Sequence, residues 1–336
     1  MALTVARERL RARRATSAGT AQLFHEAHEG AAHLSFFLNE LKSEAERLGP
    51  GDFAVEAGAG TGTLAALLAA HSDAAVLATE PAWSTDNPYR LENVHTLWRM
   101  KERHRPLAEM LEFATDAEGG LRSVDFGPRV GLARAVGEAL PVRTGAAALV
   151  YTYNCLEHMR DLPGFFGEAA RVLRRGGRLY NSTEPLHFSA QGHHLEDVFP
   201  VPWGHLLWEP EELAELAVRE AGEGREWTPG VALRPEHLRE EVLATLNGAA
   251  PGDIRRALLA GPWEVAGWAE VMDSGDERLA REMRLGDALR GVPQEALLVR
   301  GLRMRLVRRE RGTGLRSALR FSALLRRRAR RLLRRG

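Results

Sequence analysis

The chain has 336 residues, 44% hydrophobic and 27% charged, which is the balance of an ordinary globular protein. Its single cysteine, Cys155, excludes an internal disulfide framework and a cysteine-based zinc site. No run approaches eighteen consecutive apolar residues, which excludes a membrane-spanning helix, and no apolar block of a secretory signal follows the arginine-rich start. We therefore expect a cytoplasmic protein.

The net charge of +1 hides a strong asymmetry. Residues 303–336 contain fourteen arginines and one acid, about +13, so the first 302 residues carry about −12. Within 312–336, apolar residues recur at helical spacing among the arginines, which is typical of a basic amphipathic helix at a membrane surface. We expect peripheral contact with an anionic membrane on its inner face; a solvated tail and a nucleic-acid contact remain the alternatives.

The predicted elements of the first two thirds alternate between helices and strands. Residues 1–50 form a helical segment that ends at Gly49-Pro50-Gly51. Strands follow at 53–55, 74–78, 146–153 and 178–182, with helices at 63–70 and 163–174 and an inserted segment at 82–130, helical over 91–113. This alternation predicts a parallel sheet with helices on both faces.

The last third is expected to add helices and one strand. After a core over 51–233, with a possible strand near 226–232, residues 234–294 form a helical insertion that would serve as an acceptor lid. A final alternating strand lies within 295–308, before the tail.

A glycine-rich loop, Glu56-Ala57-Gly58-Ala59-Gly60-Thr61-Gly62, joins a strand to a helix. Such glycines allow a tight turn, and amide groups at the helix start can face a ligand. The spacing differs from the dinucleotide G-x-G-x-x-G, and no Walker lysine follows. Glu80 ends the second strand, where a carboxylate can accept both ribose hydroxyls of an adenosine ligand.

Further motifs follow in order: Gly137-Glu138-Ala139-Leu140-Pro141, then Leu149-Val150, then Leu156-Glu157-His158-Met159, then Ala170 to Gly177. From about Asp52 to Glu184 this series resembles the class I S-adenosylmethionine (SAM) methyltransferases, in particular the methyltransferase-11-like group. The resemblance implies a doubly wound, mostly parallel seven-stranded sheet of the Rossmann-like type and SAM as the cofactor.

The resemblance also assigns cofactor-binding residues. The methionine end of SAM would lie on the loop, the ribose on the second strand end, the adenine beside the next motif, and the sulfonium near the fourth strand end. In that order, the residues are Glu56, Gly58, Ala59, Gly60 and Gly62; Glu80 and Pro81; Glu138 and Ala139; Asn154 and Cys155. The group usually has an aspartate two residues before Glu138, where this chain has Val136.

Three histidines are the candidates for the catalytic chemistry, because methyl transfer to a hydroxyl is helped by a nearby general base. His158 follows the fourth strand, where it also belongs to the family signature and can be structural. His193 and His194 follow the fifth strand and are the leading candidates for a base or for acceptor binding. No H-E-x-x-H spacing occurs, and we expect no metal site.

The sequence therefore predicts a SAM-dependent methyltransferase that O-methylates a sugar-containing or other small acceptor, such as a cell-surface glycan or a natural product. Two alternatives remain. One is a nucleic-acid methyltransferase, favoured only by the basic tail; the other is a non-catalytic scaffold that keeps the fold.

Overall fold

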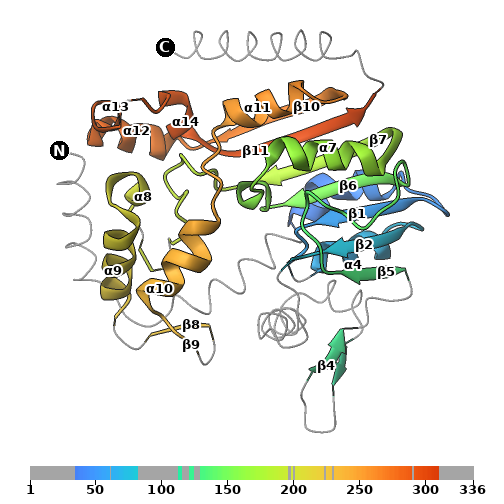
Figure 1. The fold of residues 1–336 in the computed structure, drawn as a ribbon, viewed down its shortest axis with the longest axis horizontal. Helices are drawn as coiled ribbons and strands as arrows, with labels where there is room; N and C mark the ends of the chain where they lie inside the picture. Colours follow the sequence, from blue (N-terminus) through green and yellow to red (C-terminus); the bar gives the residue numbers. More distant parts are fainter. Residues whose placement is uncertain are drawn as a thin grey trace.

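In a computed structural model, the chain forms a seven-stranded sheet in the order β10-β11-β7-β6-β1-β2-β5 (Figure 1). The structure describes residues 35–60, 62–81, 113–115, 121–124, 129–195, 198–199, 201–222, 225–228, 231–289 and 291–309. The strands of the sheet are β1 (Phe53–Ala57), β2 (Ala75–Thr79), β5 (Val130–Ala133), β6 (Ala147–Tyr153), β7 (Leu173–Thr183), β10 (Trp263–Met272) and β11 (Val299–Arg308).

Strand direction confirms the doubly wound fold. The pairs β2–β5, β1–β2, β1–β6 and β6–β7 are parallel, whereas β11 runs antiparallel to both β7 and β10. The carboxyl ends of five neighbouring strands therefore meet along one edge, where open α/β sheets bind their ligands.

Helices cover both faces of the sheet because side chains of each strand alternate between the faces. Ala54 of β1 packs with α4 (Thr63–Ala70) and with the N-terminal turns η1 (Phe37–Leu41) and α3 (Lys42–Ala45). Val55 and Ala57 pack on the other face, beneath α7 (Leu162–Val172) and α11 (Pro251–Leu259). These two apolar layers hold the loops after β1, β2 and β6 on a rigid base.

A third apolar core lies at the carboxyl edge, in two chain segments that we name the lid. Residues 184–246 leave from the end of β7, and residues 273–298 link the adjacent ends of β10 and β11, so both segments start at the same edge. They contribute the helices α8 (Gly204–Leu207), α9 (Pro210–Ala221), α10 (Pro235–His237), α12 (Ser274–Met283), α13 (Leu285–Ala288) and α14 (Gln294–Leu298), with the turns η3 (Leu238–Val242) and η4 (Leu243–Thr245). Trp203 and Phe199, both fully buried, lie at the centre of this core.

Two expectations for the last third were wrong in detail. Residues 263–272 lie inside the expected helical insertion but form β10, the edge strand beside β11. Trp263 and Val265 alternate as a half-buried strand requires, but a bulge between Val265 and Gly267 breaks the period and hides it from pattern analysis. The strand near 226–232 is a separate two-stranded ribbon of β8 (Glu226–Thr228) and β9 (Val231–Ala232).

Several predictions fall outside the described residues: the helical segment before residue 35, the helix at 91–113 and the basic tail at 312–336, with its membrane or nucleic-acid contacts. Of the inserted segment 82–130, the described part holds β3 (Phe113–Thr115), β4 (Leu121–Val124) and the start of β5. Within the described ranges, no helix has the length and apolarity needed to cross a membrane.

Candidate active site

The glycine loop takes a backbone course that needs its glycines. Gly58, Gly60 and Gly62 have φ angles of 70°, 49° and 75°, in the left-handed region that side chains disfavour. The amides of Gly58 and Ala59 both donate to the carbonyl of Thr79, at 2.9 Å each. The loop is thereby held against the end of β2.

Gly58 also touches the end of β6. A side-chain carbon built on Gly58 would lie 1.9 Å from the sulfur of Cys155. The first glycine and Cys155, nearly one hundred residues apart, are therefore in direct contact, as expected if both border one ligand. Burial raises the pKa of the Cys155 thiol well above its usual range, with Glu157 adding to the shift, so the thiol stays protonated and is not a nucleophile.

Glu80 lies where the sequence predicts, beside the glycine loop. Its Oε2 accepts a hydrogen bond from the amide of Gly60 at 3.1 Å. Its own amide donates to Ala133 at the end of β5. Pro81 follows as an exposed residue. The strand ends of β1, β2 and β5 thus converge on this carboxylate.

Glu56 is buried beneath the loop. It is buried on the α4 face, where the Tyr151 hydroxyl donates to Oε2 at 3.2 Å and the amide of Ala65, in the first turn of α4, also hydrogen-bonds the carboxylate. Burial raises the pKa of Glu56 to about 8, and the nearby charge of Glu80 adds to the rise. The two hydrogen bonds act in the opposite direction and lower the pKa. Glu56 therefore supports the loop from below.

Glu138 and Ala139 form a tight turn after β5, at the same edge. The amide of Ala139 donates to Val136, and Glu138 accepts from the amide of Asp161 at 3.2 Å. Val136 is exposed. The turn borders the predicted adenine position with backbone groups and Glu138.

Asn154 is the residue at which the chain leaves β6. Its φ of 45° is left-handed, and its Oδ1 accepts from the amide of Glu184 at the end of β7 at 3.1 Å. This bond ties together the two strand ends that flank the predicted sulfonium position.

The histidines divide into two groups. The first is His193 alone, which is 1% exposed. Its Nδ1 accepts a hydrogen bond from the amide of Leu195 at 2.9 Å, and its Nε2 is hydrogen-bonded to the carbonyl of Val201 at 3.2 Å. Its pKa falls to about 4 because of burial. With both ring nitrogens engaged, His193 has no atom left for an acceptor, and this geometry favours His194 over it.

The second group joins His158 and His194, whose ring centroids lie 5.4 Å apart, with Glu157. One ligand-type atom of each residue lies within 4.8 Å of the other two. Burial lowers the pKa of His194 to about 3, and the charge of the neighbouring His158 lowers this pKa further. His194 is therefore a weak proton acceptor at neutral pH. Burial raises the pKa of Glu157. Only His158 of the three is exposed.

Sequence analysis missed Glu157 and Asn247 as members of this site. Glu157 sits in the turn η2 (Leu156–His158), and its adjacency to His158 was the available signal. Asn247 donates to the carbonyls of Leu156 at 2.8 Å and Met159 at 2.9 Å, which fixes that turn. No local pattern marks Asn247, because its partners lie about ninety residues away.

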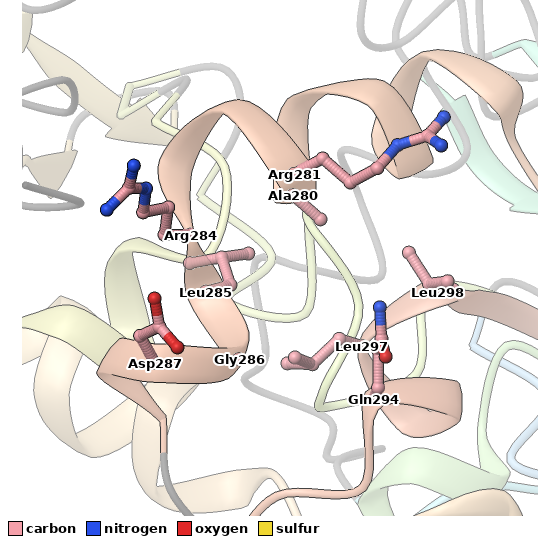
Figure 2. Close-up of a pocket in the computed structure, with 9 residues that line it drawn as sticks. All are labelled: Ala280, Arg281, Arg284, Leu285, Gly286, Asp287, Gln294, Leu297 and Leu298. Carbon is pink, nitrogen blue, oxygen red and sulfur yellow. The ribbon is translucent and has the colours of Figure 1, made fainter.

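A cavity of about 230 Å³ lies elsewhere, among α12, α13 and α14 in the lid (Figure 2). Arg284 and Asp287 line one side and Gln294 and Leu297 the other. None of the strand-end residues lines it, so it is distinct from the predicted cofactor site.

Comparison with known proteins supplies one family match. A family model described as a methyltransferase domain matches residues 106–181, which include β5, β6 and α7. No curated protein sequence matches the chain.

Several solved structures are similar at low identity. A geranyl diphosphate methyltransferase in complex with GPP and sinefungin has 15% identity and a TM-score of 0.41, over 80% of this chain and 75% of that one. A geranyl diphosphate C-methyltransferase from Streptomyces coelicolor A3(2) has 12% identity and a TM-score of 0.42, over 80% of this chain and 76% of that one. The cyclase SpnF has 16% identity and a TM-score of 0.40, over 81% of this chain and 80% of that one.

Proposed function

We propose that this chain, a class I SAM-dependent methyltransferase, transfers the methyl group of SAM to a hydroxyl of a small molecule, with sugar-containing acceptors first among the candidates. The observation that carries the proposal is the meeting of three strand ends around one position. The glycine loop contacts Cys155, and the loop amide of Gly60 donates to Glu80. The turn that begins after Cys155 carries Glu157 and His158, which lie near His194.

The cofactor residues would act as the resemblance implies, with one change. Glu80 would hold the ribose, the turn at Glu138 would border the adenine, and the loop would carry the methionine end of SAM. Glu56 acts through the loop and α4, and is therefore a positioning residue.

The transfer itself is an in-line displacement, in which the protein mainly positions the acceptor. The acceptor oxygen loses its proton and forms the new O–C bond, while the electron pair of the breaking C–S bond stays on sulfur. The products are the methyl ether, neutral S-adenosylhomocysteine and one proton. We assign activation of the hydroxyl to the Glu157–His158–His194 group, in place of the predicted pair His193 and His194.

The acceptor side supports a hydroxyl-rich molecule. Arg300 pairs with Glu184 at 2.7 Å and donates to Gln191 at 2.6 Å, and all three side chains are half-buried where the lid leaves the sheet. Each of these polar side chains has hydrogen-bonding capacity left for acceptor hydroxyls, which is why we place sugars first among the candidates.

Calorimetric titration with SAM and S-adenosylhomocysteine tests the cofactor site. We expect micromolar binding and at least a tenfold loss in Glu80→Ala, about 1.4 kcal/mol or more. Glu236→Ala, which removes an exposed carboxylate on α10, is the matched control and leaves affinity unchanged.

Labelled SAM then reports methyl transfer to a panel of sugars, nucleotide sugars and phenols, with products located by NMR. A folded protein that binds neither nucleoside would instead identify a non-catalytic scaffold. Transfer to carbon or nitrogen would overturn the hydroxyl assignment.

A further inference from the structure

Three side chains at one end of the site each bring one ligand-type atom within 4.8 Å of the other two. Glu157 and His158 come from the turn after β6, and His194 comes from the lid segment after β7. The hydrogen bonds around them show which atoms hold lone pairs.

The tautomer of His158 follows from its neighbour. Thr245 Oγ1 donates its one proton to the carbonyl of Val242 at 2.7 Å. It must therefore accept the 3.1 Å hydrogen bond from His158 Nδ1, which carries the ring proton. His158 Nε2 is left with a lone pair.

His194 is fixed in the same way. Its ring hydrogen-bonds the carbonyl of Pro185, and Nε2 is buried without a partner, so the bond comes from Nδ1–H. The backbone φ of 55° at His194 is left-handed, a strained conformation that the surrounding lid maintains. Its Nε2 also carries a lone pair.

Glu157 supplies the third donor. The Thr183 hydroxyl donates to Oε2, whereas Oε1 is buried without a hydrogen-bond partner. A buried carboxylate oxygen and a buried imidazole nitrogen without partners are costly, and a bound ion would provide both with a partner.

We propose that Glu157, His158 and His194 bind a divalent first-row transition metal ion, of the Zn²⁺ or Mn²⁺ class. Two neutral imidazoles and one carboxylate are a metal-binding donor set that leaves open coordination positions. In each histidine the other ring nitrogen is held by an oxygen, which is the usual orientation of metal-bound imidazoles. Mg²⁺ and Ca²⁺, which prefer oxygen donors, fit this set less well.

The metal's role rests on the proposed function. An open coordination position beside Cys155 would take the acceptor hydroxyl and lower its pKa. The proton then leaves to water, the oxygen forms the O–C bond, and the C–S bond breaks toward sulfur. Metal binding itself requires neither SAM nor the acceptor.

Metal content and Co²⁺ spectroscopy on the full chain test the site. After chelation and reloading, we expect one Zn²⁺ or Mn²⁺ per chain at this site and visible absorption from Co²⁺ bound to nitrogen and oxygen donors. His158→Ala, an exposed position that should not disturb folding, lowers affinity at least tenfold, as does His194→Ala. Thr245→Val, which removes the hydroxyl that orients His158, lowers it about tenfold to one hundredfold. The control is His71→Ala, beyond the end of α4 at the opposite edge of the sheet.

The outcomes separate the two proposals. Metal binding that is unchanged in both His158→Ala and His194→Ala overturns the metal site. Full methyl transfer by metal-free protein overturns the role of the metal in the reaction. In either case, SAM binding lost in Glu80→Ala still supports the methyltransferase proposal. Metal bound at this site by a protein that does not bind SAM leaves the metal site standing and removes the proposed function.

Discussion

Gly58 and Cys155 are packed so closely that any side chain on Gly58 would occupy the space of the Cys155 sulfur, 1.9 Å away. Gly58→Ala is therefore expected to cost about 1–3 kcal/mol of stability from overpacking and roughly 1 kcal/mol more from its left-handed φ. SAM affinity should fall at least tenfold, because the loop must move. Urea denaturation and calorimetry measure the two effects.

Removing the sulfur provides the control for Gly58→Ala. Cys155→Ala in the Gly58→Ala background should recover part of the stability, although the Cys155 Cβ would still lie 2.8 Å from the new carbon. Wild-type SAM affinity in the single Gly58→Ala variant would contradict this account of the loop.

Glu56 should make stability depend on pH. Burial raises its folded pKa from 4.5 to about 8, so the folded protein keeps a proton that the unfolded chain loses. Its contribution to stability is full below pH 4.5 and is lost as the pH rises through 8, by at most about 1.4 kcal/mol per pH unit. Denaturation from pH 5 to 9 should show this slope in the wild type and not in Glu56→Gln. Equal slopes in both proteins would show that another group is responsible.

His193 is expected to matter for stability and not for chemistry. His193→Phe leaves the amide of Leu195 and the carbonyl of Val201 buried without partners, which costs about 1–3 kcal/mol each. SAM affinity should stay within twofold of the wild type. Thermal denaturation measures the loss of stability, and calorimetry measures the SAM affinity. A variant that is stable but has lost turnover would show that His193 takes part in catalysis.

Asn247 should act as a positioning residue for His158. Its side chain donates to two carbonyls around η2 and accepts from the amide of Ala249 at 2.9 Å. Asn247→Ala is expected to cost about 2–4 kcal/mol and to weaken metal binding with little effect on SAM affinity. Asn39→Ala removes an exposed, local hydrogen bond and is the control. Unchanged metal affinity in a destabilised Asn247→Ala protein would restrict Asn247 to a structural role.

The sequence by itself determined the central strands of the sheet and the course of the glycine loop. Apolar runs such as 53–55 and 146–153, the glycine loop and the position of Glu80 depend on local backbone rules: glycines where φ is positive, and polar residues where a buried strand ends. These rules act over a few residues, so they can be read along the chain.

Only the tertiary structure decided the rest. The strand β10 was hidden because a bulge breaks its alternation, and its pairing with β11 joins residues 27 to 45 positions apart. The burial of Glu56 under the loop depends on Tyr151, a partner 95 residues away in the sequence. His193 and His194 are neighbours in sequence, yet one has both nitrogens bonded and the other has a free lone pair beside His158. Which atoms remain unpaired depends on partners brought together by folding, and no local pattern records them.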